Sequence, residues 1–418
     1  MRRPAKILLA GTILVMPLLP PLCAVATSQS TVDNSQYQSG DVFSTQTLNV
    51  VDVSDATTGT TTATGNAVSS AVEAGALDVR SAQTLTAAVN ASTTVNVTTN
   101  AGAQTTLTTA ATGNTSDSGS YAAGALTGTV TQTISDTGSV TAGTQFNADA
   151  AQTGAVSASA QAIGNSHGVT VQDTSATMTV NQTNNGVTQA SGDAILQYTP
   201  GDGTFSATAV SNNVTGYGTG ASSQTLTINQ TASSASPTGQ TIAEQDVHVG
   251  NGQAITGAAT ATGNNISVTN ENGPLTVTDV QSSSGYIQSQ AQVSAYEFGS
   301  VQATAYGVGN SALAGNYGQS LNLDNTQTNS GGGIDVLAKV GGNDGYDAYA
   351  TSTAMGNAVT GYACSDCNGT ISVRNTQSNS SGVGATTQVD IAASNRSVTG
   401  TATAVGNSAT FYVSKPTH

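Results

Sequence analysis

The sequence predicts an all-β fold: a repetitive parallel β-solenoid, similar to a β-helix, built from eight units of about 49 residues. Three observations predict it: an unusual composition, a motif that recurs eight times, and alternating small or aliphatic residues within each unit. Only 7% of the 418 residues are charged, against roughly 25% in an average soluble domain. Tryptophan is absent and 47 residues are glycine, yet hydrophobic residues still reach 37%. Disorder would need more charge and less hydrophobicity, so the composition favours a thin, regular β-rich body.

The first landmark is a small-x-small-x-Gly-Asn motif, as in TTATGN ending at Asn66 and ATAVGN ending at Asn407. In one unit serine replaces the glycine, in ATAVSN ending at Asn212. Successive motifs are 46 to 52 residues apart, and this regularity indicates structural repeats. The eight asparagines are Asn66, Asn114, Asn165, Asn212, Asn264, Asn310, Asn357 and Asn407.

The second landmark is a glutamine that follows each of the first seven asparagines after 17 to 20 residues. The longest offset belongs to the seventh unit, whose extra residues include Cys364 and Cys367. We therefore expect the cysteine pair on a loop insertion outside the repeating frame. The seven glutamines are Gln83, Gln132, Gln182, Gln230, Gln281, Gln327 and Gln377.

Period-2 patterns place both landmarks on strands. Small residues recur three and five residues before the asparagines, and aliphatic pairs such as Leu275 and Val277 precede the glutamines. Residues at alternate positions of a strand point to the same side. A single unit is too small to bury a core, whereas stacked units share one.

Stacking predicts a role for the landmark side chains. In a parallel solenoid, equivalent positions of successive coils lie about 4.8 Å apart. A side-chain amide has both donors and an acceptor, so recurring asparagines and glutamines are expected to form structural ladders along the stack. Alanine and glycine would line the crowded interior. The pattern leaves open whether each unit forms one coil or two.

The N-terminal residues have the features of an export signal. Arg2, Arg3 and Lys6 precede an apolar run over 7–22, and small residues precede a cleavage point before Thr27. We expect residues 1–26 to be a signal peptide, which makes the protein secreted across the inner membrane, and 27–418 to be the β-repeat body. After the signal, the chain has five basic residues and 23 acidic ones. Nucleic acid is therefore not an expected partner, because its binding needs a basic surface.

Chemistry-bearing motifs are scarce. Cys364 and Cys367 are expected to form a local disulfide, because an exported chain meets an oxidising compartment. Asn343, Asp344 and Asp347 lie close together in GGNDGYD, but one such cluster without a spaced further ligand does not define a calcium site. No catalytic fingerprint occurs in a supporting context, so we expect no enzyme, cofactor or metal.

With its export signal, acidic Thr/Ala/Asn/Gln-rich body and repeated A-x-G-N and N-x-Q elements, the sequence resembles the holdfast anchor protein D (HfaD) family of stalked bacteria. The likeness covers most of the chain after the signal. It implies a surface-exposed adhesin or anchor at the outer membrane that attaches an adhesive polysaccharide holdfast to the cell envelope. It further implies a companion anchor protein and a CsgG-like secretion lipoprotein as partners.

Two other functions stay open on sequence grounds: a β-solenoid polysaccharide-degrading enzyme and an ice-binding solenoid. The second requires threonine pairs to form one flat exposed lattice. Self-association is also expected, because the apolar run 411–413 lies in the last unit, where it would pair with the first coil of another chain. In the competing interpretation, Lys415 and Pro416 block that edge.

Overall fold

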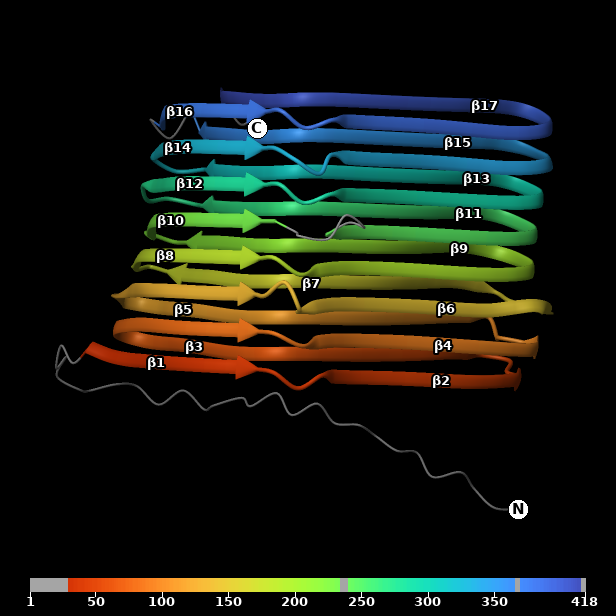
Figure 1. Cartoon of the computed structure of the whole chain (residues 1–418), viewed down its shortest axis with the longest axis horizontal. Coiled ribbons are helices and arrows are strands. Elements are labelled where there is room, and N and C mark those ends of the chain that lie inside the picture. Colours follow the sequence, from red (N-terminus) through yellow and green to blue (C-terminus); the bar gives the residue numbers. More distant parts are fainter. Residues whose placement is uncertain (1–28, 234–239, 365–368, 415–418) are drawn as a thin grey trace, which may run out of the picture.

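The computed structural model describes residues 29–233, 240–364 and 369–414. These residues form one parallel sheet of seventeen strands that winds upward as a stack of coils (Figure 1). The predicted all-β, solenoid-like fold is confirmed. Within the described ranges, no helix has the length and apolarity needed to cross a membrane.

The strands lie at the following positions along the chain. They are β1 (Gln29–Gln38), β2 (Val42–Asp52), β3 (Ala56–Leu85), β4 (Ala88–Asn100), β5 (Gln104–Ile134), β6 (Ser139–Gln152), β7 (Ala155–Gln172), β8 (Ser175–Asn184), β9 (Val187–Thr219), β10 (Ser223–Ala232), β11 (Thr241–Asn270), β12 (Leu275–Ser283), β13 (Ile287–Asn316), β14 (Ser320–Asn329), β15 (Ile334–Cys364), β16 (Thr370–Asn379) and β17 (Val383–Ser414).

Each repeat unit forms one coil, which answers the question that the sequence left open. Asn66 pairs in register with Asn114, and Gln83 with Gln132, so equivalent residues of successive units are direct strand neighbours. A coil has three segments: in the first coil these are a short segment at β1, a second segment at β2 and a third segment over 56–73 of β3. The chain then begins the next coil with residues 76–85, which pair with β1.

Two apolar clusters fill the interior, and each follows the period-2 pattern. One lies between the second and third segments and includes Val95 and Phe146. The other lies between the short segment and the later part of the third segment and includes Leu126 and Leu226. The landmark asparagines and glutamines from Asn66 to Asn357 and from Gln83 to Gln327 are buried between residues of these two clusters. A polar seam therefore runs through the core along the whole stack.

Threonine pairs lie side by side on the outer face of the short segments. In four consecutive coils, T-x-T pairs occupy the same register positions, and all their side chains are at least partly exposed. The pairs are Thr127/Thr129, Thr177/Thr179, Thr225/Thr227 and Thr276/Thr278.

Candidate functional site

The eight asparagines form one hydrogen-bonded column inside the stack. Each Nδ2 donates to the Oδ1 of the asparagine in the next coil, over 2.7–2.8 Å. The bonds run, in chain order, Asn66→Asn114→Asn165→Asn212→Asn264→Asn310→Asn357→Asn407. All of these donors point toward the C-terminal coil.

The glutamines form a second column with the opposite polarity. Each Nε2 donates to the Oε1 of the glutamine in the preceding coil, over 2.7–2.8 Å. The bonds run Gln377→Gln327→Gln281→Gln230→Gln182→Gln132→Gln83→Gln36. Gln36 is an additional member that the sequence pattern missed, because it precedes the first Gly-Asn motif and so has no offset to be measured from.

The second amide hydrogen of each column side chain except Asn407 joins the two walls of the coil. Asn264 Nδ2 also donates to the Ser282 carbonyl at 2.9 Å, and Gln230 Nε2 also donates to the Asn265 carbonyl at 2.9 Å. The same pair of cross-links recurs along the stack. Each interior amide therefore uses both donors and its acceptor, which removes the penalty for burying it.

A glycine precedes seven of the eight asparagines, and close contact between coils explains it. A Cβ at Gly65, Gly113 or Gly309 would lie 2.5–2.6 Å from the carbonyl oxygen of the glycine in the next coil. In the fourth coil Ser211 replaces the glycine, and its hydroxyl lies 2.6 Å from the hydroxyl of Thr241. The Gly-Asn dipeptide thus combines close backbone approach with an amide that links coils.

Two buried titratable residues interrupt the second apolar cluster. His167 is fully buried, its Nδ1 lies 2.7 Å from Ser116 Oγ, and burial lowers its pKa to about 4. Asp279 is the register neighbour of Ile228, and burial, followed by the charge of Asp324, raises the pKa of its carboxyl well above the usual value. The His167 imidazole is therefore neutral near pH 7, and burial favours the protonated form of the Asp279 carboxyl.

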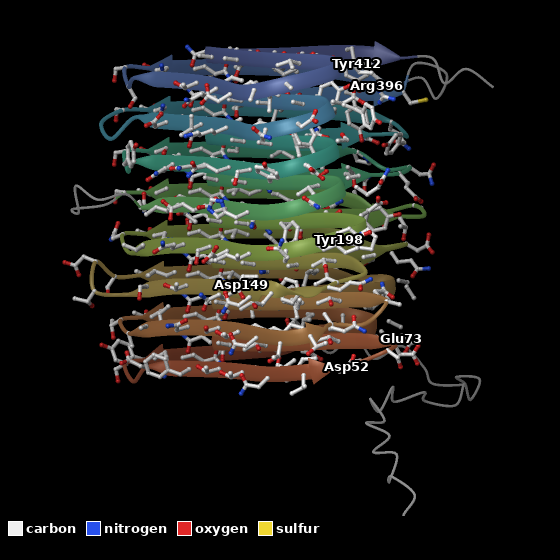
Figure 2. The ribbon with its side chains drawn as sticks, turned by 90° about the vertical axis from the view of Figure 1, so that its right-hand side faces the viewer. Asp52, Glu73, Asp149, Tyr198, Arg396 and Tyr412 are labelled. Atoms are coloured by element: carbon white, nitrogen blue, oxygen red, sulfur yellow. The ribbon has the colours of Figure 1, made fainter. Side chains whose placement is uncertain are left out.

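A groove lies along the corner where the second segments turn into the third segments. It consists of two adjoining hollows of about 500 Å³ and about 420 Å³. Their walls come from residues 195–200, 248–253, 294–299 and 341–346, one stretch from each of four consecutive coils, together with Asp149. We call this the edge groove. Figure 2 looks onto this side of the stack and labels Asp149 and Tyr198 there.

Tyrosines and carboxylates line the edge groove. Tyr198, Tyr296 and Tyr346 are 46%, 62% and 53% exposed. Glu297 and Asp344 are register neighbours in successive coils and line the same hollow. No repeat pattern in the sequence groups the three tyrosines, because they occupy different positions within their units.

The cluster in GGNDGYD is divided by the fold. Asn343 lines one hollow and Asp344 the other, whereas the carboxylate of Asp347 is hydrogen-bonded by Arg396 through both Nε and Nη2. This pairing holds the pKa of Asp347 below its usual value. Among the residues that the structure describes, no group of three or more His, Cys, Asp or Glu side chains is placed to hold a metal ion.

The cysteine pair is only partly visible. Cys364 ends β15 and is disulfide-bonded, while its expected partner Cys367 lies outside the described residues, as do residues 1–26.

Comparison with known proteins identifies one family. The family model described as HfaD, holdfast attachment protein D, matches residues 51–333. No curated protein and no solved structure matches the chain.

Proposed function

Because the chain belongs to the holdfast attachment protein D family, which acts in holdfast attachment, we propose that it is a surface-exposed structural anchor. In this role it fastens an adhesive polysaccharide holdfast to the outer membrane and catalyses no reaction. One observation carries the proposal: two uninterrupted amide columns of opposite polarity link all eight coils. Such a body suits an anchor, because a load on any coil is shared with its neighbours through backbone ladders and interior side chains.

We propose export across the inner membrane, directed by residues 1–26. The disulfide at Cys364 supports an oxidising location, since disulfides persist outside the cytoplasm. The companion anchor protein and the CsgG-like secretion lipoprotein remain proposed partners that rest on the family resemblance.

We also propose head-to-tail self-association. At the N-terminal coil, the last members of the two columns are Gln36 and Asn66. At the C-terminal coil, they are Gln377 and Asn407. If a second copy stacks on the last coil, its Gln36 Nε2 faces Gln377 Oε1, and Asn407 Nδ2 faces its Asn66 Oδ1. Both bonds continue the direction of the existing columns. A contact of this kind does not close on itself, so it would extend into a filament.

The test of the anchor role is genetic. Deleting the gene should release adhesive polysaccharide into the medium while its synthesis continues. Retention of the holdfast on cells that lack the protein would contradict the proposal. Loss of polysaccharide synthesis would also contradict it, because an anchor acts after synthesis.

One observation favours the enzyme alternative. Glu297 and Asp344 lie in adjacent coils of the same hollow, and paired carboxylates are the usual groups for glycoside hydrolysis. Release of new reducing ends from a polysaccharide, abolished by Glu297→Gln, would establish that activity.

One observation also favours the ice-binding alternative, namely the four T-x-T pairs that lie in register on the short segments. Inhibition of ice recrystallisation by the purified protein, lost in Thr179→Tyr, would establish it.

A further inference from the structure

We propose that Tyr317 and Tyr362 are an oxidative cross-linking site, at which a peroxide-driven oxidation joins the two rings into dityrosine. The site goes beyond the proposed anchor role and lies at a different corner of the coil from the edge groove. Three features lead to it: the contact between the two phenols, the fixed position of the Tyr362 ring, and the exposure of the pair.

The pair belongs to a row of three tyrosines at the corner where the third segments turn into the short segments. Tyr317 directly follows β13, Tyr362 lies near the end of β15, and Tyr412 lies near the end of β17. Tyr362 and Tyr412 are register neighbours, and Figure 2 labels Tyr412 in the last coil. We call these three residues the tyrosine row. Three of the twelve tyrosines of the chain therefore lie in consecutive coils at one corner.

Tyr317 and Tyr362 are in contact through both their rings and their hydroxyls. Tyr362 Oη donates to Tyr317 Oη at 2.8 Å, and the ring centroids lie 5.2 Å apart with an angle of 61° between the planes. The carbons that join in dityrosine are those next to the carbon that carries the hydroxyl, so a hydroxyl contact also brings these carbons close. Tyr362 and Tyr412 are stacked instead, with centroids 5.7 Å apart and an angle of 19°. The hydroxyl contact therefore distinguishes the first pair from the second.

The fold fixes the Tyr362 ring against the preceding coil. Gly315 is the register neighbour of Tyr362, and a Cβ at this glycine would overlap the ring. Burial, followed by the hydrogen bond to Tyr317, raises the pKa of the Tyr362 phenol above its usual value, so the group stays protonated and keeps its bond at neutral pH. The two phenols are thus held together before any reaction, which favours coupling within the pair over coupling with a distant tyrosine.

The pair lies at the surface, in an environment that preserves an oxidised side chain. Tyr317 is 57% exposed and Tyr362 is half-buried, so a small oxidant reaches the pair from solvent. Cys364, two residues after Tyr362, is disulfide-bonded, which is typical of an oxidising location. Oxidation products of side chains are therefore already stable at this corner.

Hydrogen peroxide, used by a haem peroxidase, balances the reaction. Each phenol loses one electron and one proton and becomes a phenoxyl radical. The two radicals form a carbon–carbon bond between their rings, and the hydrogens displaced from the joined carbons return to the oxygens as protons. The peroxide takes up the two electrons and two protons and becomes two water molecules. The new bond links the sixth coil covalently to the seventh, near the C-terminal end of the stack.

Cross-linking is measured on the purified full chain after treatment with hydrogen peroxide and a haem peroxidase. Dityrosine is quantified by its fluorescence, and the bond is located by mass spectrometry after disulfide reduction and trypsin digestion. Trypsin separates the two rings unless they are bonded, because Lys339 lies between them in the sequence. Tyr317→Phe and Tyr362→Phe each remove one phenol and keep the ring. Tyr412→Phe is the matched control, since it changes the third member of the tyrosine row and leaves the pair intact.

We expect the folded wild type to lose two hydrogen atoms while keeping the mass of a single chain, with a bond between the Tyr317 peptide and peptide 340–374. Tyr317→Phe and Tyr362→Phe should each lower the dityrosine yield at least about tenfold, and Tyr412→Phe should change it less than about twofold. Wild type oxidised in urea should lose the preference for this pair, because the fold holds the two phenols together.

Equal yields from the wild type and Tyr362→Phe would overturn the inference. A bond that joins two chains, or one that pairs Tyr362 with Tyr412, would overturn it as well. Each of these outcomes leaves the anchor role untouched, because that role is tested separately by the release of holdfast from cells that lack the gene.

Discussion

An interior asparagine should be far more important to stability than the same residue at the end of the column. Asn264 is completely buried and takes part in three hydrogen bonds: it donates to Asn310 Oδ1 at 2.8 Å and to the Ser282 carbonyl at 2.9 Å, and accepts from Asn212 at 2.8 Å. Replacement by alanine removes all three and leaves a buried donor and two buried acceptors unpaired. At about 1 kcal/mol for each bond, plus the desolvation penalty of the unpaired groups, we expect a cost of about 3–5 kcal/mol.

Asn407 provides the matched control in the last coil. Its side chain accepts from Asn357 at 2.7 Å and is exposed, so alanine there removes one bond and water replaces the partner. We expect a cost of about 0.5–1 kcal/mol. The two substitutions are chemically identical and differ only in their place along the column.

The assay is urea unfolding followed by far-UV circular dichroism. The free energies of unfolding are compared between variants that have the same m-value, the slope of the free energy against urea concentration. A difference of at least 2 kcal/mol between Asn264→Ala and Asn407→Ala is the expected result. Costs that agree within about 0.5 kcal/mol would refute the reasoning, because they would mean that the column adds nothing in the interior beyond what it adds at its end.

Four further predictions follow from the same geometry. Burial lowers the pKa of His167 to about 4, below its unfolded value near 6.5, so the unfolded state binds the proton first as the pH falls. The free energy of unfolding of the wild type should therefore decrease by up to about 3 kcal/mol between pH 6.5 and 4 because of this residue. The variant His167→Val should lack this contribution. Gly309→Ala should cost about 1–3 kcal/mol and lower the Tm, because its Cβ would press on the next coil; an unchanged Tm would show that the backbone spacing is not limiting. Analytical ultracentrifugation should show large oligomers that deletion of residues 408–418 reduces, and a strictly monomeric wild type at high concentration would rule out head-to-tail association. Cys364→Ala/Cys367→Ala should leave the Tm nearly unchanged, because the expected bridge closes a very small ring, and a strong decrease would contradict this.

The sequence determined the repeat, its strand character and the identity of the residues that stack. This was possible because a solenoid converts sequence period directly into spatial adjacency: residues one unit apart become strand neighbours, so Asn66 and Asn114 meet without any long-range fold to be guessed. The period-2 pattern also indicated the inward side, since alternation is a local property of a strand.

Only the tertiary structure decided the features that depend on two segments of a coil facing each other. The opposite polarity of the two amide columns follows from how Asn264 and Gln230 reach carbonyls across the interior, and no single strand carries that information. The edge groove likewise arises where one segment turns into the next, and the path of the turn brings Tyr198 and Tyr346 to one hollow from different positions in their units. Periodicity fixes which residues are stacked, whereas the direction of a turn and the contacts across the interior depend on side-chain packing, which no sequence period records.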